Sequence, residues 1–138
     1  MTNLTLKAQQ TFSQDLYATQ STGITIDKVE EGYACCRVVL QPHHRNAMGA
    51  VMGGVMFTLA DLTFAAAANS RCLKDDNPLA WVSLNSSIHY LSQPKGGMLI
   101  AESEQVKQGH TTCVFNIYIY DEHNNRTAVV TTTGIRVN

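Results

Sequence analysis

One segment of the chain combines the residue types that acyl-transfer chemistry uses. Gly53 and Gly54 precede a long apolar run that contains one carboxylate, Asp61. Glycines at a helix start let a ligand approach the backbone closely, and the first amide N–H groups have no helical partner. Those donors lie at the positive end of the helix dipole and suit a carbonyl oxygen that becomes negative during acyl transfer. Asp61 follows Gly54 by two helical turns, so we expect it on the same face, together with Thr58.

These residues taken alone also fit a structural explanation. Gly53 and Gly54 would then permit tight packing, and Asp61 would accept hydrogen bonds from backbone donors inside a buried helix. The segment by itself is therefore compatible with a catalytic carboxylate and with a structural one.

The wider pattern resembles the hotdog-fold acyl-CoA thioesterases, especially their phenylacetate-pathway and hydroxybenzoyl-CoA branch. That family usually shows Asn, then Gly, then His-Gly-Gly, then an apolar turn ending in Leu-Ala-Asp. The matching residues here are Asn46, Gly49, Gly53, Gly54, Leu59, Ala60 and Asp61. The likeness continues in residues 82–91 and 108–111, and it extends over residues 35–137. The resemblance implies hydrolysis of acyl-CoA thioesters.

The resemblance also implies a role for each matching residue. Asp61 would be the nucleophile, giving a mixed anhydride, or the general base that activates water. The Gly53 amide would donate to the oxyanion, Asn46 would orient the carbonyl or the water, and Ser83 would help place the attacking group. The family forms its site between two subunits. Asn46 and Gly53 of one chain would then face Asp61 and Ser83 of its partner. The assembly would be a dimer or a tetramer of two dimers.

One position departs from the family pattern, because Met52 stands where the family usually has His. If that His only buttresses the loop, Met52 fills its volume and activity survives. If the imidazole polarises the thioester carbonyl, the rate falls. We favour the buttress role, since the oxyanion donor that matters is a backbone amide. We expect the acyl pocket along the central helix, with these substrate-binding residues: Met52, Gly54, Val55 and Thr58.

Two functions of other classes stay open. Hydratase relatives carry a catalytic His five residues after the Asp, but Ala66 occupies that position here. A non-catalytic acyl-CoA-binding domain is favoured only by Met52, and the four retained site residues count against it. No cofactor is expected. Adjacent histidines such as His43 and His44 point apart in an extended chain and have no accompanying ligand set, so we expect no metal site.

Composition narrows the class of protein. The 138 residues fit a single domain, residues 1–138, and the net charge of −1 with scattered Lys and Arg argues against nucleic-acid binding. Charged residues make up only 15% of the chain, which favours an oligomer. The four cysteines form no C-x-x-C pair and no signal-peptide pattern is present, so we expect a cytoplasmic protein. Residues 50–68 are almost uncharged, but Asp61 and the many Ala and Gly residues disfavour a membrane span.

Hydrophobic periodicity predicts the elements that position the site. An N-terminal helix is expected within residues 1–20, over Leu4 to Thr19, and one central helix from Gly53 to about Cys72. Six strands are expected in residues 24–40 (two strands flanking a Glu31-Gly32 turn), 81–91, 98–106, 111–120 and 127–137.

Two strand faces follow from the alternation of apolar and polar residues. In residues 111–120 one face carries Cys113, Phe115, Ile117 and Ile119. In residues 81–91 we expect Ser83 opposite a face that carries Val82, Leu84, Ile88 and Tyr90. The whole order indicates an α+β protein, and with the resemblance it predicts a hotdog fold, an antiparallel sheet wrapped around one long central helix.

Overall fold

The computed structural model describes residues 1–138. Its six strands are β1 (Ile24–Glu30), β2 (Tyr33–Val39), β3 (Trp81–Tyr90), β4 (Met98–Gln108), β5 (Thr112–Asp121) and β6 (Arg126–Arg136). Its helices are α1 (Asn3–Phe12), the π-helix η1 (Tyr17–Thr22), the 3-10 helix η2 (Pro42–His44), α2 (Gly53–Ala68) and α3 (Ser70–Lys74). None of these helices combines the length and the apolar character that crossing a bilayer would require.

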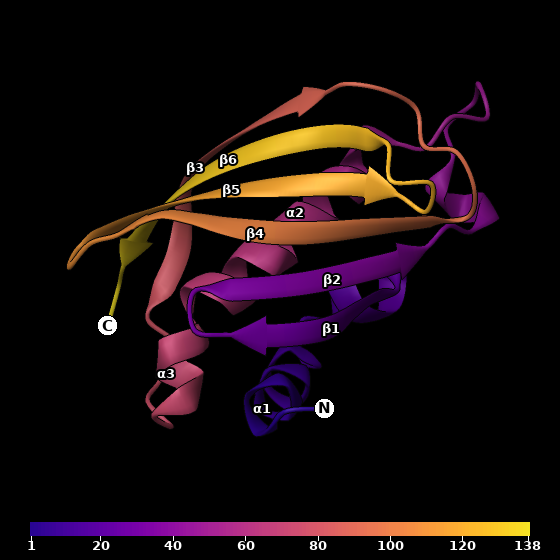
Figure 1. Cartoon of the computed structure of the whole chain (residues 1–138). Coiled ribbons are helices and arrows are strands. Elements are labelled where there is room, and N and C mark those ends of the chain that lie inside the picture. The colour runs from indigo at the N-terminus through magenta and orange to yellow at the C-terminus, as the bar shows by residue number, and fades with distance from the viewer.

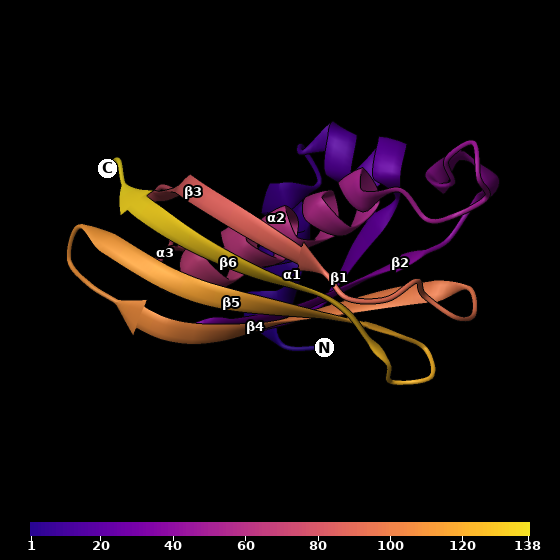
Figure 2. The ribbon, with the colours of Figure 1, turned by 90° about the horizontal axis from the view of Figure 1, so that it is seen from above.

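All strands join one antiparallel sheet in the order β1-β2-β4-β5-β6-β3. The sheet curves around α2, which lies against its inner face (Figure 1). Seen from above, the helices gather on that side and β4 and β5 form the opposite, outer side (Figure 2). The predicted fold is therefore confirmed, with one central helix inside a wrapped antiparallel sheet.

The core lies between α2 and the inner face of the sheet. The rings of Phe64 on α2 and Phe115 on β5 meet edge to face with centroids 5.8 Å apart, a geometry that aromatic pairs favour. Gly134 on β6 leaves room for Phe64, because a Cβ there would lie 2.7 Å from the ring. The residues predicted to share the inner face of β5 are all buried: Cys113, Phe115, Ile117 and Ile119.

The alternation predicted for β3 is wrong, because the strand contains a β-bulge. Ser83 and Asn85 pair with consecutive residues of β6, which leaves Leu84 as an extra residue. Residues directly paired across strands share a face, and one inserted residue reverses the alternation. Ser83 therefore lies on the same inner face as Ile88 and Tyr90. Strict alternation had predicted that Ser83 lies on the opposite face.

The N-terminal helix expected over residues 4–19 is interrupted. The hydroxyl group of Ser13 donates a hydrogen bond to the carbonyl of Gln10 at 2.6 Å and ends α1. Serine side chains compete in this way with the helical hydrogen-bond ladder. After a short turn that contains Asp15, the chain continues as η1, and Gly23 ends it with φ at 85°.

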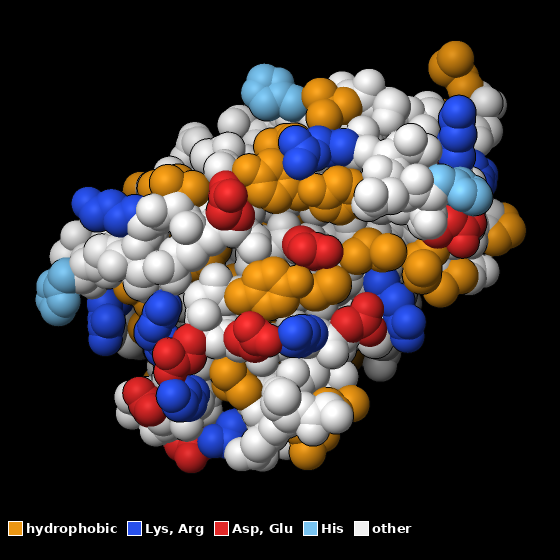
Figure 3. Space-filling view, viewed as in Figure 1, with side chains coloured by type: hydrophobic (Ala, Val, Ile, Leu, Met, Phe, Trp, Pro, Cys, Tyr) orange, Lys and Arg blue, Asp and Glu red, His pale blue; other side chains and the backbone are white.

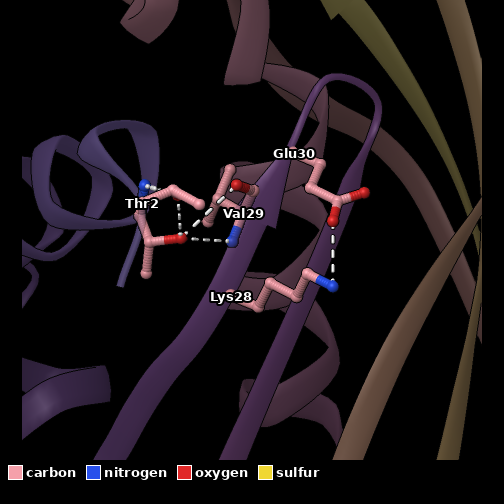
Figure 4. A network of polar contacts seen from close by, with 5 residues as sticks. Thr2, Lys28, Val29 and Glu30 are labelled. Carbon is pink, nitrogen blue, oxygen red and sulfur yellow. Dashed lines mark hydrogen bonds and ion pairs between the residues drawn. The ribbon is translucent and has the colours of Figure 1, made fainter.

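Two threonines fix α1 to the sheet. The Thr2 hydroxyl caps the helix by accepting from the Thr5 N–H at 3.1 Å. The Thr5 hydroxyl in turn accepts from the Val29 N–H on β1 at 3.0 Å. Figure 4 shows this network beside the exposed ion pair between Lys28 and Glu30, whose charged atoms are 2.9 Å apart. α1 therefore covers β1, the strand at one edge of the sheet.

The central helix ends at Ala68, earlier than the predicted end near Cys72. Asn69 is buried, and its side-chain oxygen accepts from the backbone N–H groups of Ala80 and Trp81, both at 2.9 Å. Its side-chain nitrogen donates to the Trp81 carbonyl at 3.1 Å. Because Asn69 binds the start of β3 in this way, it separates α2 from α3.

The outer face of the sheet is mixed in character. Figure 3 shows Lys and Arg side chains scattered among acidic and apolar ones on this face. The guanidinium group of Arg126 lies 4.5 Å from the centroid of the Tyr118 ring, and the Tyr118 hydroxyl donates to Glu104 at 2.9 Å. A polyanion would meet no extended basic stripe on the face in view.

Candidate active site

The N-terminus of α2 presents free amide groups. The backbone N–H groups of Gly53 and Gly54 have no acceptor within the chain. Met52 precedes them in an extended conformation and gives no side-chain cap. These donors lie at the positive end of a 16-residue helix, where a negative oxygen is stabilised. Gly53 lies against β3, because a Cβ added to it would be 2.5 Å from the Tyr90 hydroxyl oxygen.

Asn46 shapes the loop that leads into α2. Its side-chain oxygen accepts from the N–H groups of Met48 at 2.9 Å and Ala50 at 3.0 Å, so its side-chain nitrogen remains available as a donor. Asn46 and Gly53 line one pocket of about 380 Å³, together with Tyr90 at the end of β3. The structure therefore brings two of the predicted catalytic residues together.

A buried histidine anchors the same loop. The Nδ1 atom of His44 accepts from the Gln41 N–H at 2.9 Å, so its Nε2–H donates to the Thr22 carbonyl at 2.8 Å. This pattern requires the neutral ring. Burial lowers the pKa of His44 and outweighs the hydrogen bond to Thr22, which acts to raise it. The His44 carbonyl also accepts from the Met52 N–H at 2.9 Å, which fixes the residue before the two glycines.

Asp61 lies on the solvent-facing stripe of α2. Gly54 and Thr58 share this stripe, as the sequence predicts, and the Thr58 hydroxyl donates to the Gly54 carbonyl at 2.8 Å. Asp61 lines a pocket of about 320 Å³ that α2 forms with the turn between α1 and η1. That turn contributes a second carboxylate, Asp15.

The surroundings of Asp61 raise its pKa above the ordinary value for a carboxyl group. Partial burial of the carboxylate is the larger cause, and repulsion from the negative charge of Asp15 adds to it. Solvent still reaches the Asp61 side chain in the single chain, so the environment is that of a pocket mouth. A carboxylate with a raised pKa is a stronger base, as general-base catalysis near neutral pH requires.

The remaining predicted residues lie elsewhere in the single chain. A third pocket, of about 270 Å³, is lined by Met52, Gly54 and Val55 against η1 and η2. Ser83 is exposed on β3, the edge strand of the sheet, and lines none of these pockets. One chain therefore gathers Asn46 with Gly53, but it leaves Asp61 and Ser83 apart from them.

Known proteins match both this sequence and this fold. A profile of the family described as "Thioesterase superfamily" matches residues 48–128, which include the α2 glycines, Asp61 and Ser83. The chain belongs to the thioesterase superfamily. Within that superfamily, the acyl-coenzyme A thioesterase PaaI of Escherichia coli K12 is 30% identical to this chain over 111 residues, which are 80% of this chain and 75% of that protein.

Solved structures of the thioesterase superfamily share the fold. The structure of the E. coli PaaI protein from the phenylacetic acid degradation operon superposes with a TM-score of 0.82 at 28% identity, covering 99% of this chain and 97% of that one. A hypothetical thioesterase protein with coenzyme A from Streptococcus pneumoniae gives a TM-score of 0.80 at 26% identity over 92% and 97% of the two chains. The hotdog branch predicted from the motif is therefore confirmed.

Three residues at the site escaped the sequence interpretation. Tyr90 contacts Gly53, His44 anchors the loop, and Asp15 shares the pocket of Asp61. Tyr90 and Asp15 come from elements distant in the sequence from Gly53 and Asp61, and His44 also binds Thr22, 22 residues earlier, so no local spacing reveals these contacts. Of the three residues, only His44 belongs to a feature noted in the sequence, the adjacent histidines. In the structure its ring anchors the loop through two hydrogen bonds to backbone groups.

Proposed function

We propose that the chain hydrolyses acyl-CoA thioesters to the free acid and CoA. One observation carries the proposal: the same helix, α2, provides a free amide N–H at Gly53 and a carboxylate without a partner at Asp61. Superfamily membership supports thioester chemistry, and the name of the E. coli relative supports an acyl-CoA substrate. The CoA in the streptococcal structure supports the same ligand class.

Two routes to the products use these groups. In the first, an oxygen of Asp61 attacks the thioester carbon, the C–S bond breaks, and water then hydrolyses the mixed anhydride. In the second, Asp61 takes a proton from a water molecule whose oxygen attacks the same carbon. In both, the Gly53 N–H stabilises the oxyanion, while Asn46 and Ser83 orient the carbonyl and the attacking group. A single turnover in ¹⁸O-labelled water tests the anhydride route, because label enters Asp61 only when water attacks the Asp61 carbonyl of such an anhydride.

The complete site is proposed to form between two chains. β3 is an edge strand with no neighbour beyond it, and three of its large apolar side chains are exposed, those of Val82, Leu84 and Tyr90. An uncovered edge of this kind favours pairing with another strand. Joining two β3 edges would bring the Asn46 and Gly53 pocket of one chain towards Asp61 and Ser83 of the other. A dimer, or a tetramer of two dimers, is accordingly the proposed assembly.

The substrate would lie along the exposed stripe of α2. Met52, Gly54 and Val55 line the pocket beside its N-terminus, and Thr58 lies between that end and Asp61. Met52 is half exposed and lines this pocket, where under the buttress role its side chain would take the place of the family's His. The four cysteines are free, which supports a reducing, cytoplasmic location.

The test is thiol release from a panel of acyl-CoAs by the wild type and by Asp61→Asn. We expect turnover that falls at least about a hundredfold in the variant, the scale of a lost general base. Binding of CoA, measured by calorimetry, should be retained. Asp75→Asn is the matched control, because Asp75 is an exposed loop carboxylate outside the site. If the wild type and the variants bind CoA but none of them releases thiol from any acyl-CoA, a non-catalytic acyl-CoA-binding domain is favoured. Loss of the absorbance of an enoyl-CoA substrate would favour a hydratase.

A further inference from the structure

Two unpaired carboxylates share one pocket. Asp15, in the turn after α1, and Asp61, on α2, line the same cavity of about 320 Å³. Neither side chain takes part in an ion pair, and neither receives a hydrogen bond that affects its pKa. The backbone carbonyl of Asp15 accepts from the Thr19 N–H at 2.9 Å, but its carboxylate supports no part of the fold.

The rest of this pocket contains no positive charge. Besides the two carboxylates and Thr58, the lining consists of Leu16, Tyr17, Ala18, Leu62 and Ala65. Two like charges on a largely apolar wall repel each other and are partly desolvated, which opposes folding. Local costs of this kind are expected at functional sites. Asp15 therefore does not stabilise the fold, and it shares a pocket with Asp61, the carboxylate proposed for catalysis.

We infer that Asp15 is a specificity-determining residue, which makes the acyl pocket accept neutral acyl groups and reject those that end in a carboxylate. The inference rests on the proposed function, which places the acyl group beside Asp61. An acyl chain that enters this pocket and ends in a carboxylate would add a third negative charge to those of Asp15 and Asp61. A neutral chain of the same length meets only the apolar wall. Such discrimination by repulsion is a common source of specificity.

The test compares hexanoyl-CoA with adipoyl-CoA, whose six-carbon acyl groups differ by one terminal carboxylate. Both are assayed for kcat/KM, and their non-hydrolysable thioether analogues are assayed for Kd by calorimetry. The proteins are wild type, Asp15→Asn, the charge-retaining Asp15→Glu, and Asp75→Asn as the control for net charge. We expect Asp15→Asn to raise the adipoyl-to-hexanoyl ratio about fivefold, as for a repulsive pair that is still partly exposed to solvent. High salt should reduce the preference of the wild type for hexanoyl-CoA over adipoyl-CoA, because dissolved ions screen the repulsion between carboxylates.

Each result bears on a different claim. A ratio that Asp15→Asn changes no more than Asp75→Asn overturns the inference, while turnover of hexanoyl-CoA would leave the proposed function standing. Charge discrimination in Kd that depends on Asp15, without turnover of either substrate, supports the inference and overturns hydrolysis. If neither analogue binds and neither substrate is turned over, both claims fail. Asp15→Glu should behave as wild type, and a change there equal to that of Asp15→Asn would contradict a role for charge.

Discussion

Gly53 at the start of α2 lies directly against the ring of Tyr90 at the end of β3. A Cβ at Gly53 would be 2.5 Å from the Tyr90 hydroxyl oxygen and 2.6 Å from its Cζ atom. We expect Gly53→Ala to destabilise the protein by about 1–2 kcal/mol, as overpacking does. In a Tyr90→Ala background the same change should be nearly neutral, because the clashing ring is gone. Thermal or urea unfolding of the four proteins in this cycle gives the coupling.

A matched glycine controls for the change in backbone freedom. Gly97 is exposed in the loop before β4, and nothing lies within 4 Å of a Cβ added there. Gly97→Ala should therefore leave the free energy of unfolding almost unchanged in both backgrounds. If Gly53→Ala costs the same with and without the Tyr90 ring, the contact between them is not what requires glycine.

The overall architecture could be predicted because it depends on patterns within each element. The strict alternation of Cys113, Phe115, Ile117 and Ile119 follows from burial on one face of β5, and that burial is observed. The spacing of Gly54, Thr58 and Asp61 likewise follows from the helical period. Local periodicity of this kind is a direct consequence of strand and helix geometry.

The errors came from single residues that interrupt a regular pattern. Leu84 is the extra residue of a bulge, which becomes visible only from the register against β6. Asn69 ends α2 because its side chain binds the start of β3, eleven and twelve residues further along the chain. Asp15 lines the pocket of Asp61 because the expected N-terminal helix breaks at Ser13, where a local hydrogen bond to Gln10 ends it. Apolar periodicity contains no information about such contacts.

The pH dependence of turnover should report the pair of Asp15 and Asp61. Asp61 must be ionised in either route, and its raised pKa moves the acid limb of kcat/KM to higher pH than for an ordinary carboxyl group. Removing the Asp15 charge in Asp15→Asn lowers the pKa of Asp61, so the limb should shift towards lower pH. The pH–rate profile with hexanoyl-CoA measures this, and Asp75→Asn should show the wild-type profile. A shift towards higher pH in Asp15→Asn would contradict the repulsion.

The buried ring of His44 should make the stability of the fold sensitive to acid. Its pKa is lowered in the folded state, so the unfolded chain binds the proton more readily, and stability falls as the pH drops below the unfolded value of about 6.5. His44→Ala should cost about 2–3 kcal/mol, because the Gln41 N–H and the Thr22 carbonyl lose their buried partner. It should also remove this part of the pH dependence.

Urea unfolding between pH 5 and pH 8 measures both effects of His44. His110 provides the control, because it is exposed in the turn before β5, whereas the ring of His43 packs against the ring of His44 with centroids 4.3 Å apart. His110→Ala should change the free energy of unfolding little and should retain the wild-type pH dependence. A pH dependence that survives in His44→Ala would assign the acid sensitivity to another group.

The free edge of β3 should decide both assembly and activity. Leu84 is 62% exposed in the single chain, on the strand through which two chains are proposed to pair. Leu84→Glu places a charge at that edge, and desolvating it in an interface is unfavourable, so we expect a monomer in sedimentation or light-scattering measurements. Thioesterase turnover should then fall at least about tenfold, because Asn46 and Gly53 lose the partner's carboxylate. Thr25→Glu, on the opposite edge strand that α1 covers, should remain assembled and active. A fully active monomer would place the whole site within one chain.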